Sequence, residues 1–236
     1  MVSVLPLRLE AAEAWRRGRR VVGPVDLTVA APGLTAVIGP NGSGKTSLLR
    51  LMHGLLPPRG GAVAWAVPTT RARAAQAFVS QRPVALRRSV AANLAFPLRL
   101  RGVPRAAARA RAAAQARAFG LEALMAQPGP SLSGGEMQRL ALARALIAAP
   151  EILFADEPCA ALDGAATREV ERILADAAAR VAVVLATHDM GQARRLADAV
   201  VFLLGGRVHE AGPAAAFFDA PRTPEARAFL AGEIVG

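Results

Sequence analysis

One glycine-rich segment restricts the possible folds of this chain more than any other part of its sequence. It follows an apolar run and opens a stretch with apolar residues at helical spacing, and it consists of Gly39, Pro40, Asn41, Gly42, Ser43, Gly44, Lys45 and Thr46. A strand, then glycines spaced as they are here before a Lys-Thr pair, and then a helix form the pattern of a phosphate-binding loop. Its glycines let backbone N–H groups turn inward around phosphates, and the helix N-terminus adds partial positive charge. We therefore expect an α/β fold in which Lys45 reaches the β- and γ-phosphates of a nucleotide and Thr46 ligates Mg²⁺.

The composition of the basic residues supports this role for Lys45. The chain carries 29 Lys and Arg side chains, and Lys45 is the only lysine among them. A planar guanidinium cannot replace a slim ammonium at the floor of a narrow phosphate loop. The single lysine is therefore expected at the place where an arginine would not function.

The formal charge of +11 raises the question of a nucleic-acid partner. Nucleic-acid binding uses a basic face, ideally with stacking aromatic side chains. Here the arginines are scattered, aromatic residues make up 4% of the chain, and runs such as Arg16-Arg17-Gly18-Arg19-Arg20 are typical of solvated loops. We expect no nucleic-acid partner, and attraction to an anionic membrane surface is the favoured alternative.

The apolar residues form short runs, none of which approaches the roughly 18–20 residues that cross a bilayer. The first ten residues lack the pattern of a secretion signal, and the single cysteine, Cys159, has no partner for an internal disulfide. These features predict a cytoplasmic protein.

The rest of the chain alternates strand and helix patterns. Apolar runs predict strands at 5–9, 25–29, 34–38, 62–67, 152–155, 181–186, 200–204 and 207–210. Helices are expected at 43–55, in an alanine- and arginine-rich stretch from about 89 to 124, after residue 133 and in the tail 213–230. The continuous apolar runs are typical of a parallel sheet covered on both faces, which predicts an α/β core with a helical insert.

Polar residues follow two of the predicted strands. Asp156 and Glu157 end the run 152–155, and Thr187-His188-Asp189 follow the run 181–186. Beside a phosphate loop, Asp156 is expected to hold Mg²⁺, directly or through water, and Glu157 to polarise the attacking water. Acidic pairs at strand ends are also common surface features, so this prediction depends on the phosphate loop.

A second helix start contains two glycines. Ser133 precedes Gly134 and Gly135, and Glu136 completes the spacing of a capping box. An ordinary helix start is one interpretation, but two glycines in a first turn weaken a helix by about 1 kcal/mol each relative to alanine. That cost is understandable if the bare backbone approaches a ligand closely. A second anion-binding helix end suggests that two surfaces meet one nucleotide.

Together these motifs resemble the nucleotide-binding subunit of ATP-binding-cassette (ABC) transporters over nearly the whole chain. The resemblance is carried, in order, by the phosphate loop, Gln81, the signature 132–138, the acidic pair, Ala161-Leu162-Asp163 and Thr187-His188-Asp189. It implies a P-loop NTPase of the RecA-like type within a single domain, 1–236. This fold has a mostly parallel sheet, an N-terminal antiparallel β subdomain and an inserted α-helical subdomain at approximately 85–148.

The resemblance also implies roles for individual residues. The catalytic residues would be Lys45, Glu157 and His188, with the histidine holding the water and Glu157 in register at the γ-phosphate. The Mg²⁺ ligands would be Thr46, Gln81 and Asp156. Besides the loop, the ATP contacts would be Trp15 stacked on adenine, Ser47, Gln81, and the helix start Ser133, Gly134 and Gly135 facing the ATP of an opposite subunit. Asp163 would lie at the subunit interface. Without the resemblance, Trp15 would be read as a packing residue and His188 as incidental.

Four positions depart from the common family pattern. Cys159-Ala160 stand where many relatives have Thr-Ser, which removes one possible hydrogen bond across the interface. Trp15 replaces the commoner tyrosine, and Glu136 replaces the frequent glutamine. The loss of the serine hydroxyl is expected to alter coupling between subunits rather than the basic chemistry, and Glu136 is a variation that the family tolerates.

The resemblance implies a cassette on the inner face of the membrane that holds ATP against a second copy of itself or a paralogous cassette. Its other partners would be transmembrane permease subunits and an external substrate-binding protein. The tail from Phe217 to Glu233 resembles those of oxyanion importers, tungstate-type first and then phosphate and molybdate, and polar amino-acid importers end similarly. We expect no added regulatory domain. Three alternatives remain open: a P-loop kinase or GTPase, a relative acting on DNA or ribosomes, and a purely structural phosphate-binding module.

Overall fold

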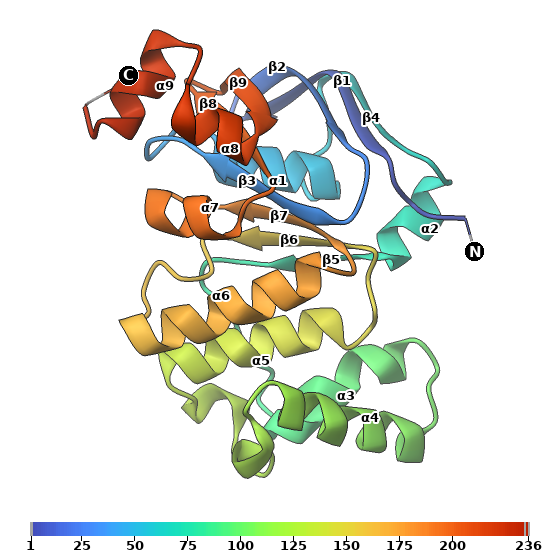
Figure 1. Cartoon of the computed structure of the whole chain (residues 1–236). Helices are drawn as coiled ribbons and strands as arrows, with labels where there is room; N and C mark the ends of the chain where they lie inside the picture. The colour runs from blue at the N-terminus through green and yellow to red at the C-terminus, as the bar shows by residue number, and fades with distance from the viewer. Residues whose placement is uncertain (1, 234, 236) are drawn as a thin grey trace.

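Two β-sheets enclose the helix that follows the phosphate loop (Figure 1). The computed structural model describes residues 2–233 and 235, so three residues of the predicted domain 1–236 lie outside the description. The smaller sheet is antiparallel in the order β2-β1-β4, with β1 at Leu7–Arg16, β2 at Arg19–Val29 and β4 at Gly60–Trp65. The larger sheet has the order β5-β6-β7-β3-β8-β9.

The larger sheet is parallel from β5 to β8, and only its edge strand β9 is antiparallel. Its strands are β3 (Gly33–Ile38), β5 (Gln76–Val79), β6 (Ile152–Asp156), β7 (Ala182–Ala186), β8 (Ala199–Leu204) and β9 (Arg207–Pro213). Alternate residues of one strand enter different cores: Phe154 of β6 packs on the side of α1 (Lys45–His53), whereas Leu153 packs on the opposite side. Both faces are covered, which explains why these strands are apolar at successive positions.

Helices cover the face of the larger sheet opposite α1. They are α5 (Gly134–Leu146), α6 (Gly164–Ala178), α7 (Met190–Leu196), α8 (Ala214–Asp219) and α9 (Pro224–Leu230). A short helix, α2 (Thr69–Ala74), leads into β5. No helix in the described part of the chain is long and apolar enough to cross a membrane.

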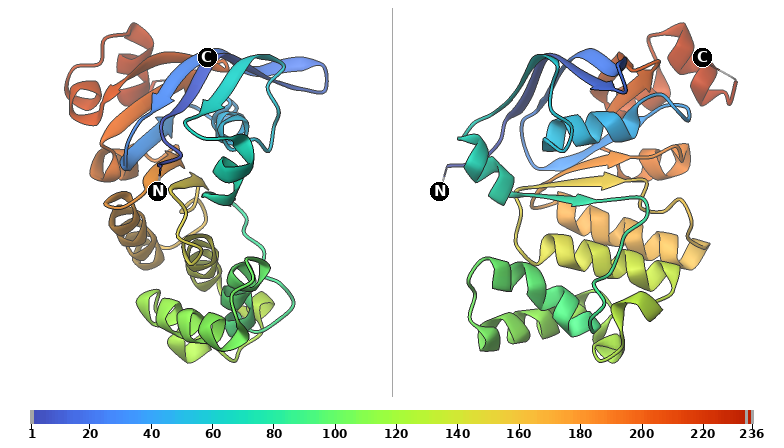
Figure 2. Two further views of the ribbon diagram at one scale, coloured as in Figure 1. Left: turned by 90° about the vertical axis from the view of Figure 1, so that its right-hand side faces the viewer. Right: turned by 180° about the vertical axis from the view of Figure 1, so that it is seen from behind.

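A separate helical lobe lies below the sheet (Figure 2). It contains α3 (Val90–Leu100), α4 (Arg105–Ala118) and two 3₁₀ turns, Glu122–Leu124 and Gly129–Ser131, and it shares a third apolar core with α5. Alanines at every fourth position of α4, Ala108, Ala112 and Ala116, are buried in this core, and the arginines between them are exposed. That spacing places one small-residue face of the helix against α3.

The α/β prediction is confirmed, including the antiparallel sheet and the mostly parallel one. Four elements were not among the predicted ones, namely β5, α2, α6 and α7. β5 has only four residues, too few for a periodic pattern to stand out. The arginine run Arg16–Arg20 is not a loop, because Arg16 ends β1 and β2 begins at Arg19.

Candidate functional site

The phosphate loop is shaped by glycines that no other residue could replace. A Cβ on Gly39 would lie 2.0 Å from the carbonyl oxygen of Leu203, and one on Gly44 would lie 2.8 Å from the carbonyl oxygen of Val21. Both glycines also have left-handed backbones, with φ of 148° and 103°. The loop is therefore pressed against β8 and β2 by its backbone alone.

Lys45 begins α1 and its side chain is only 5% exposed. The Nζ atom donates to the carbonyl oxygens of Gly39 at 2.8 Å and Pro40 at 3.0 Å, and it lies 3.8 Å from Oε1 of Glu157. Burial lowers the pKa of Lys45, and the carboxylates of Glu157 and Asp156 oppose that shift. The ammonium is thus held inside the loop, where it can face the oxygens of a bound phosphate.

A hollow of about 400 Å³ opens beside this ammonium. Its walls come from the start of β2, the phosphate loop, the end of β6 and the β8–β9 turn: Arg20, Val21, Asn41, Gly42, Gly44, Lys45, Thr46, Ser47, Glu157, Gly205 and Gly206. The buried hydroxyl of Ser43, under the loop, has no hydrogen-bond partner among the described residues. Ser43 itself does not line the hollow, and a phosphate chain there would supply acceptors for the N–H groups of the loop residues that do.

Two oxygen atoms at the edge of the hollow suit a magnesium ion. The Oγ1 atom of Thr46 donates to Oδ1 of Asp156 at 2.8 Å. Burial raises the pKa of Asp156, while the hydrogen bond from Thr46 and the charge of Arg50 act in the other direction. The described residues contain no cluster of three Asp, Glu, His or Cys ligands. Mg²⁺ commonly takes one or two protein oxygens together with substrate phosphates and water, so this small donor set fits that ion.

Glu157 is the meeting point of residues that are far apart in the sequence. Its Oε2 atom accepts from Nε2 of Gln81 at 3.2 Å and lies 3.3 Å from Nδ1 of His188, while Oε1 faces Lys45. Its φ is +46°, a left-handed conformation, and its N–H donates to the carbonyl oxygen of Ala186 at 2.9 Å. Such a backbone costs about 1–3 kcal/mol and is typical of functional sites. Here it directs the carboxylate into the hollow.

The second helix start forms another hollow, of about 410 Å³. It lies between α5 and α6 and is lined by Ser133, Gly134, Gly135, Glu136, Arg139, Ala161, Leu162, Asp163, Ala165, Ala166 and Glu169. The predicted capping box is present: Oγ of Ser133 accepts from the N–H of Glu136, and the Glu136 carboxylate accepts from the N–H of Ser133 at 2.8 Å. The hydrogen bonds that the Glu136 carboxylate accepts from the N–H and from the hydroxyl of Ser133 lower the pKa of Glu136. Asp163 caps α6 by accepting from the N–H groups of Ala165 and Ala166.

The structure brings some of the predicted site residues together and keeps others apart. Lys45, Gln81, Glu157 and His188 are in mutual contact through the Glu157 carboxylate, and Thr46 is bonded to Asp156. The two hollows share no lining residue, so the Ser133 helix start does not belong to the hollow of its own chain's phosphate loop. Trp15, on β1, lines neither hollow and remains 39% exposed.

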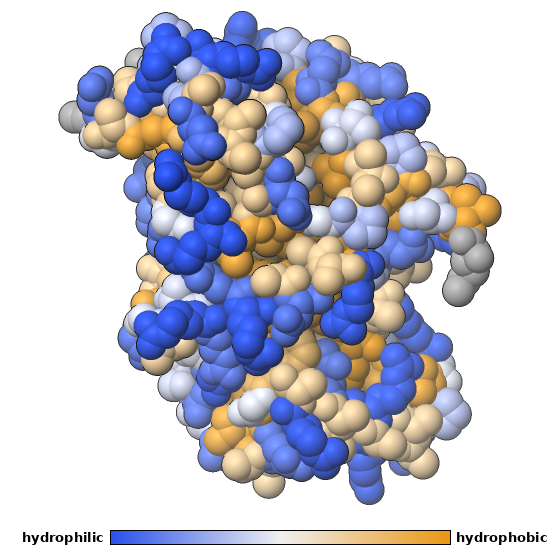
Figure 3. Space-filling view, viewed as in Figure 1, coloured by the Kyte–Doolittle hydropathy of each residue, from blue (hydrophilic) through white to orange (hydrophobic). Residues whose placement is uncertain are grey.

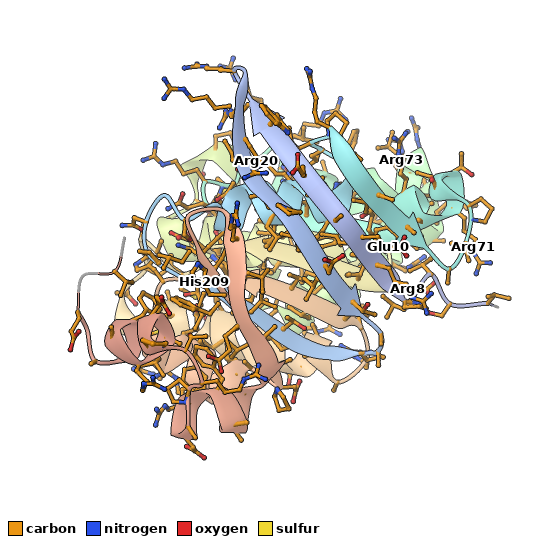
Figure 4. The ribbon with its side chains drawn as sticks, turned by 90° about the horizontal axis from the view of Figure 1, so that it is seen from above. Arg8, Glu10, Arg20, Arg71, Arg73 and His209 are labelled. Carbon is orange, nitrogen blue, oxygen red and sulfur yellow. The ribbon has the colours of Figure 1, made fainter. Side chains whose placement is uncertain are left out.

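Four lining residues of the phosphate hollow are not among the predicted site residues: Arg20, Val21, Gly205 and Gly206. Arg20 lies on β2 (Figure 4) and belongs to the arginine run that was interpreted as a solvated loop. Its position five residues after Trp15, across a turn that contains Gly18, is the signal that could have indicated a hairpin. Hydrophilic residues otherwise occur over both lobes of the face in Figure 3 and are not gathered in one stripe.

Cys159, which stands where many relatives have threonine, is expected to be unreactive. Burial raises the pKa of this thiol to about 11, so it stays protonated at neutral pH. A buried protonated thiol is a poor nucleophile and a weak hydrogen-bond donor.

Comparison with known proteins gives one consistent result. The family model described as "ABC transporter" matches residues 22–160. The methionine import ATP-binding protein MetN of Cereibacter sphaeroides is 37% identical over 95% of this chain and 68% of its own length. The tungstate uptake system ATP-binding protein TupC of Peptoclostridium acidaminophilum is 38% identical over 82% of this chain and 92% of its own. Other relatives at similar identity are named for sulfate/thiosulfate, phosphate and Fe(3+) import.

The fold also matches a solved structure. A bacterial Atm1-family ABC exporter with ATP bound superposes with a TM-score of 0.82 and 24% identity over the whole of this chain. The chain spans 43% of that exporter's length. At this identity the match describes the fold alone.

Proposed function

This chain belongs to the ABC transporter family and is an ATPase of that family, and from this premise we propose that it energises a membrane importer. The observation that carries the proposal is the contact of Lys45, Gln81 and His188 with one carboxylate, that of Glu157, at the wall of a phosphate-sized hollow. All the relatives compared above are named as import or uptake ATP-binding proteins.

We propose that Glu157 polarises the water that attacks the γ-phosphate. Its carboxylate can accept a hydrogen bond from that water while Gln81 and His188, at 3.2 and 3.3 Å, fix its orientation. Lys45 would neutralise the charge that develops on the phosphate oxygens. Mg²⁺ held by Thr46 and Asp156 would supply further electrostatic stabilisation of the phosphates when bound. Positioning and charge stabilisation account for most of the catalysis in phosphoryl transfer, and this arrangement offers both.

We propose further that the second hollow completes the site of another copy of the chain, or of a paralogous cassette. The Ser133 helix start offers bare backbone N–H groups and a positive helix end, which suit a γ-phosphate. Because this hollow shares no residue with the phosphate hollow of its own chain, ATP would have to be shared between two subunits. Nucleotide binding would then favour the closed pair, since only that state makes both sets of contacts.

An apolar groove beside Gln81 supports docking of a permease. It has a volume of about 510 Å³ and is lined mainly by β5, the segment after it, α3 and α5. Val84 and Leu100 at its rim are 77% and 72% exposed. An apolar element of a transmembrane subunit would cover these side chains and sense Gln81, which contacts Glu157. We propose that the chain lies on the inner face of the membrane, with a substrate-binding protein on the other side.

The catalytic proposal is tested by Glu157→Gln. This variant is expected to bind ATP with normal affinity, to accumulate as an ATP-bound dimer in size-exclusion chromatography, and to lose roughly 10²–10³-fold in hydrolysis. Glu122→Gln is the matched control, because Glu122 forms an exposed ion pair with Arg117 in the helical lobe. Normal turnover by Glu157→Gln would remove Glu157 from the role of base.

For the cargo we propose an inorganic oxyanion such as tungstate, supported by the relation to TupC. The relation to MetN at nearly the same identity makes an amino acid the second candidate. Purifying the chain with its permease and binding protein, then measuring bound metal oxyanions and amino acids by mass spectrometry, separates the two. Stimulation of hydrolysis by DNA or ribosomes instead of the permease would favour the non-transport alternative.

A further inference from the structure

The β1–β2 hairpin carries an acidic residue between two candidate nucleotide contacts. Glu13 and Trp15 are two positions apart on β1, and Trp15 is paired in register with Arg20 of β2. Residues two apart on a strand, and residues opposite each other on paired strands, point to the same face of a sheet. The carboxylate, the indole and the guanidinium therefore lie together on one face.

The carboxylate of Glu13 bonds both neighbours through different oxygens. Nε1 of Trp15 donates to Oε2 at 3.1 Å, and Nη1 of Arg20 donates to Oε1 at 2.9 Å. These two hydrogen bonds, the one from Trp15 first, lower the pKa of Glu13, so the group is ionised at neutral pH. The indole N–H is donor-only, so this bond determines which way the edge of the ring faces.

This arrangement is attached to the phosphate site. Arg20 lines the phosphate hollow together with Asn41 and Lys45. The same strand, β2, is also bonded to the backbone of the hollow, because the N–H of Gly23 donates to the carbonyl oxygen of Gly206 at 2.7 Å. Other arginines near this sheet, Arg8 of β1 and Arg71 and Arg73 of α2, lie toward the other end of the hairpin (Figure 4) and line no part of the hollow.

We propose that Glu13, anchored by Arg20 at the wall of the phosphate hollow, is a positioning residue that holds the indole of Trp15 beside Arg20, so that the purine ring of ATP stacks on a pre-oriented indole. The inference rests on the proposed ATP-binding function and deepens it. A freely rotating indole would lose rotamer entropy on binding, and Glu13 removes part of that loss in advance. Glu13 should therefore affect binding of the base more than binding of the phosphates, because only Arg20 of this arrangement lines the phosphate hollow.

The experiment compares ATP with inorganic tripolyphosphate, which has no base. We expect Glu13→Ala to raise both the KM and the Kd for ATP about three- to tenfold. Its kcat should stay within about twofold, because Glu13 touches none of the reacting groups. The Kd for tripolyphosphate should change less than the Kd for ATP. Glu13→Gln, which keeps an acceptor for the indole but loses the charge that holds Arg20, should fall between Glu13→Ala and the unmodified chain.

Fluorescence supplies a readout that a merely structural role would not move. In a Trp65→Phe background Trp15 is the only tryptophan, and Glu13→Ala should shift its emission in the absence of nucleotide. Glu122→Gln again serves as the control, because it removes the carboxylate of another exposed Arg–Glu pair and should change none of these quantities. The kinetic measurements use the chain with both tryptophans, so they do not depend on the stability of the Trp65→Phe background.

Two results would overturn the inference: unchanged ATP affinity in Glu13→Ala, or an equal loss of affinity for ATP and tripolyphosphate. Trp15→Ala separates this failure from a failure of the proposed function. If Trp15→Ala weakens ATP binding and Glu13→Ala does not, Trp15 stacks on the base without help from Glu13. If neither variant weakens it, the assignment of Trp15 as the base platform is wrong as well.

Discussion

The chain carries two hollows of nearly equal volume, about 400 and 410 Å³, that differ completely in chemistry. The phosphate hollow contains a buried lysine and Glu157, and Asp156 lies bonded to Thr46 at its edge. The signature hollow, at the start of α5, uses its polar side chains locally, since Glu136 caps its own helix and Asp163 caps α6. The first hollow has the groups for chemistry, and the second mainly presents backbone.

The difference indicates how one chain could make hydrolysis depend on its neighbour. A surface that offers only oriented backbone N–H groups does little alone, but it can stabilise charge on a phosphate delivered from outside. The phosphate hollow contains the titratable groups, but it lacks the backbone N–H groups that the signature hollow would add. Under the proposed function, neither hollow is a complete site, and four experiments test this contrast and the helix that carries Lys45.

The largest effect is expected from Lys45→Arg. The side chain is 5% exposed and its Nζ is held at 2.8 Å by a loop carbonyl, which leaves no room for a guanidinium. ATP hydrolysis should fall by about 10²–10³-fold, and ATP should no longer raise the Tm of the protein. The control is Arg172→Lys, which replaces an exposed arginine of α6 by lysine. A Lys45→Arg protein that turns over normally would show that the hollow does not need a slim ammonium.

Gly134→Ala is expected to have the next largest effect. A Cβ at Gly134 would meet only Leu162, at an ordinary 3.9 Å, so the isolated chain should be as stable as before or gain up to about 1 kcal/mol of helix propensity. Nucleotide affinity of the monomer should stay the same, yet hydrolysis should fall at least about tenfold if a second subunit's ATP approaches this backbone.

Gly135→Ala provides the contrast, since its Cβ would lie 2.9 Å from that of Ala166 and should lower the Tm. Unimpaired hydrolysis in Gly134→Ala would argue that the signature hollow does not meet a nucleotide.

Mixing the two inactive proteins should restore part of the activity. In a pair made of one Lys45→Arg chain and one Gly134→Ala chain, one site combines an intact phosphate loop with an intact signature, and the other site has both defects. Random pairing predicts about one quarter of the normal rate at most. Titrating one variant against the other in an ATPase assay measures this recovery, and activity that never rises above that of the separate variants would contradict a shared site.

The smallest effect concerns the stability of α1, the helix that carries Lys45. His53 lies near its C-terminal end against the rings of Phe78 and Phe154, and burial lowers the pKa of this imidazole below its ordinary 6.5. Protonation then favours the unfolded chain, so stability present above pH 6.5 should decline as the pH falls through that value toward the folded pKa. The slope is at most about 1.4 kcal/mol per pH unit.

The pH dependence is measured by urea unfolding between pH 5.5 and 7.5. His53→Phe should flatten this part of the curve, and the exposed control His209→Gln should not. A slope that persists in His53→Phe would assign the effect to another group.

Much of the candidate site could be predicted because its signals are local. The capping box needs only Ser133 and Glu136 three residues apart, and the loop needs its glycines next to Lys45. Neighbours in sequence are necessarily neighbours in space, so such patterns determine both the conformation and the groups it presents. The contact of Glu157 with His188 could be expected because the carboxyl ends of neighbouring parallel strands meet at one edge.

The tertiary structure alone decided where the arginines of the β1–β2 hairpin lie. By sequence, Arg20 is one of 28 arginines and sits in a charged run. Only the register that pairs Trp15 with Arg20, and the packing of that strand against Gly206, brings its guanidinium to Glu13 and to the phosphate hollow. The sequence therefore determined which groups perform the proposed chemistry. The packing of the strands decided which of the many arginines lies beside these groups, because the position of a charged side chain is fixed only when its backbone is packed in the fold.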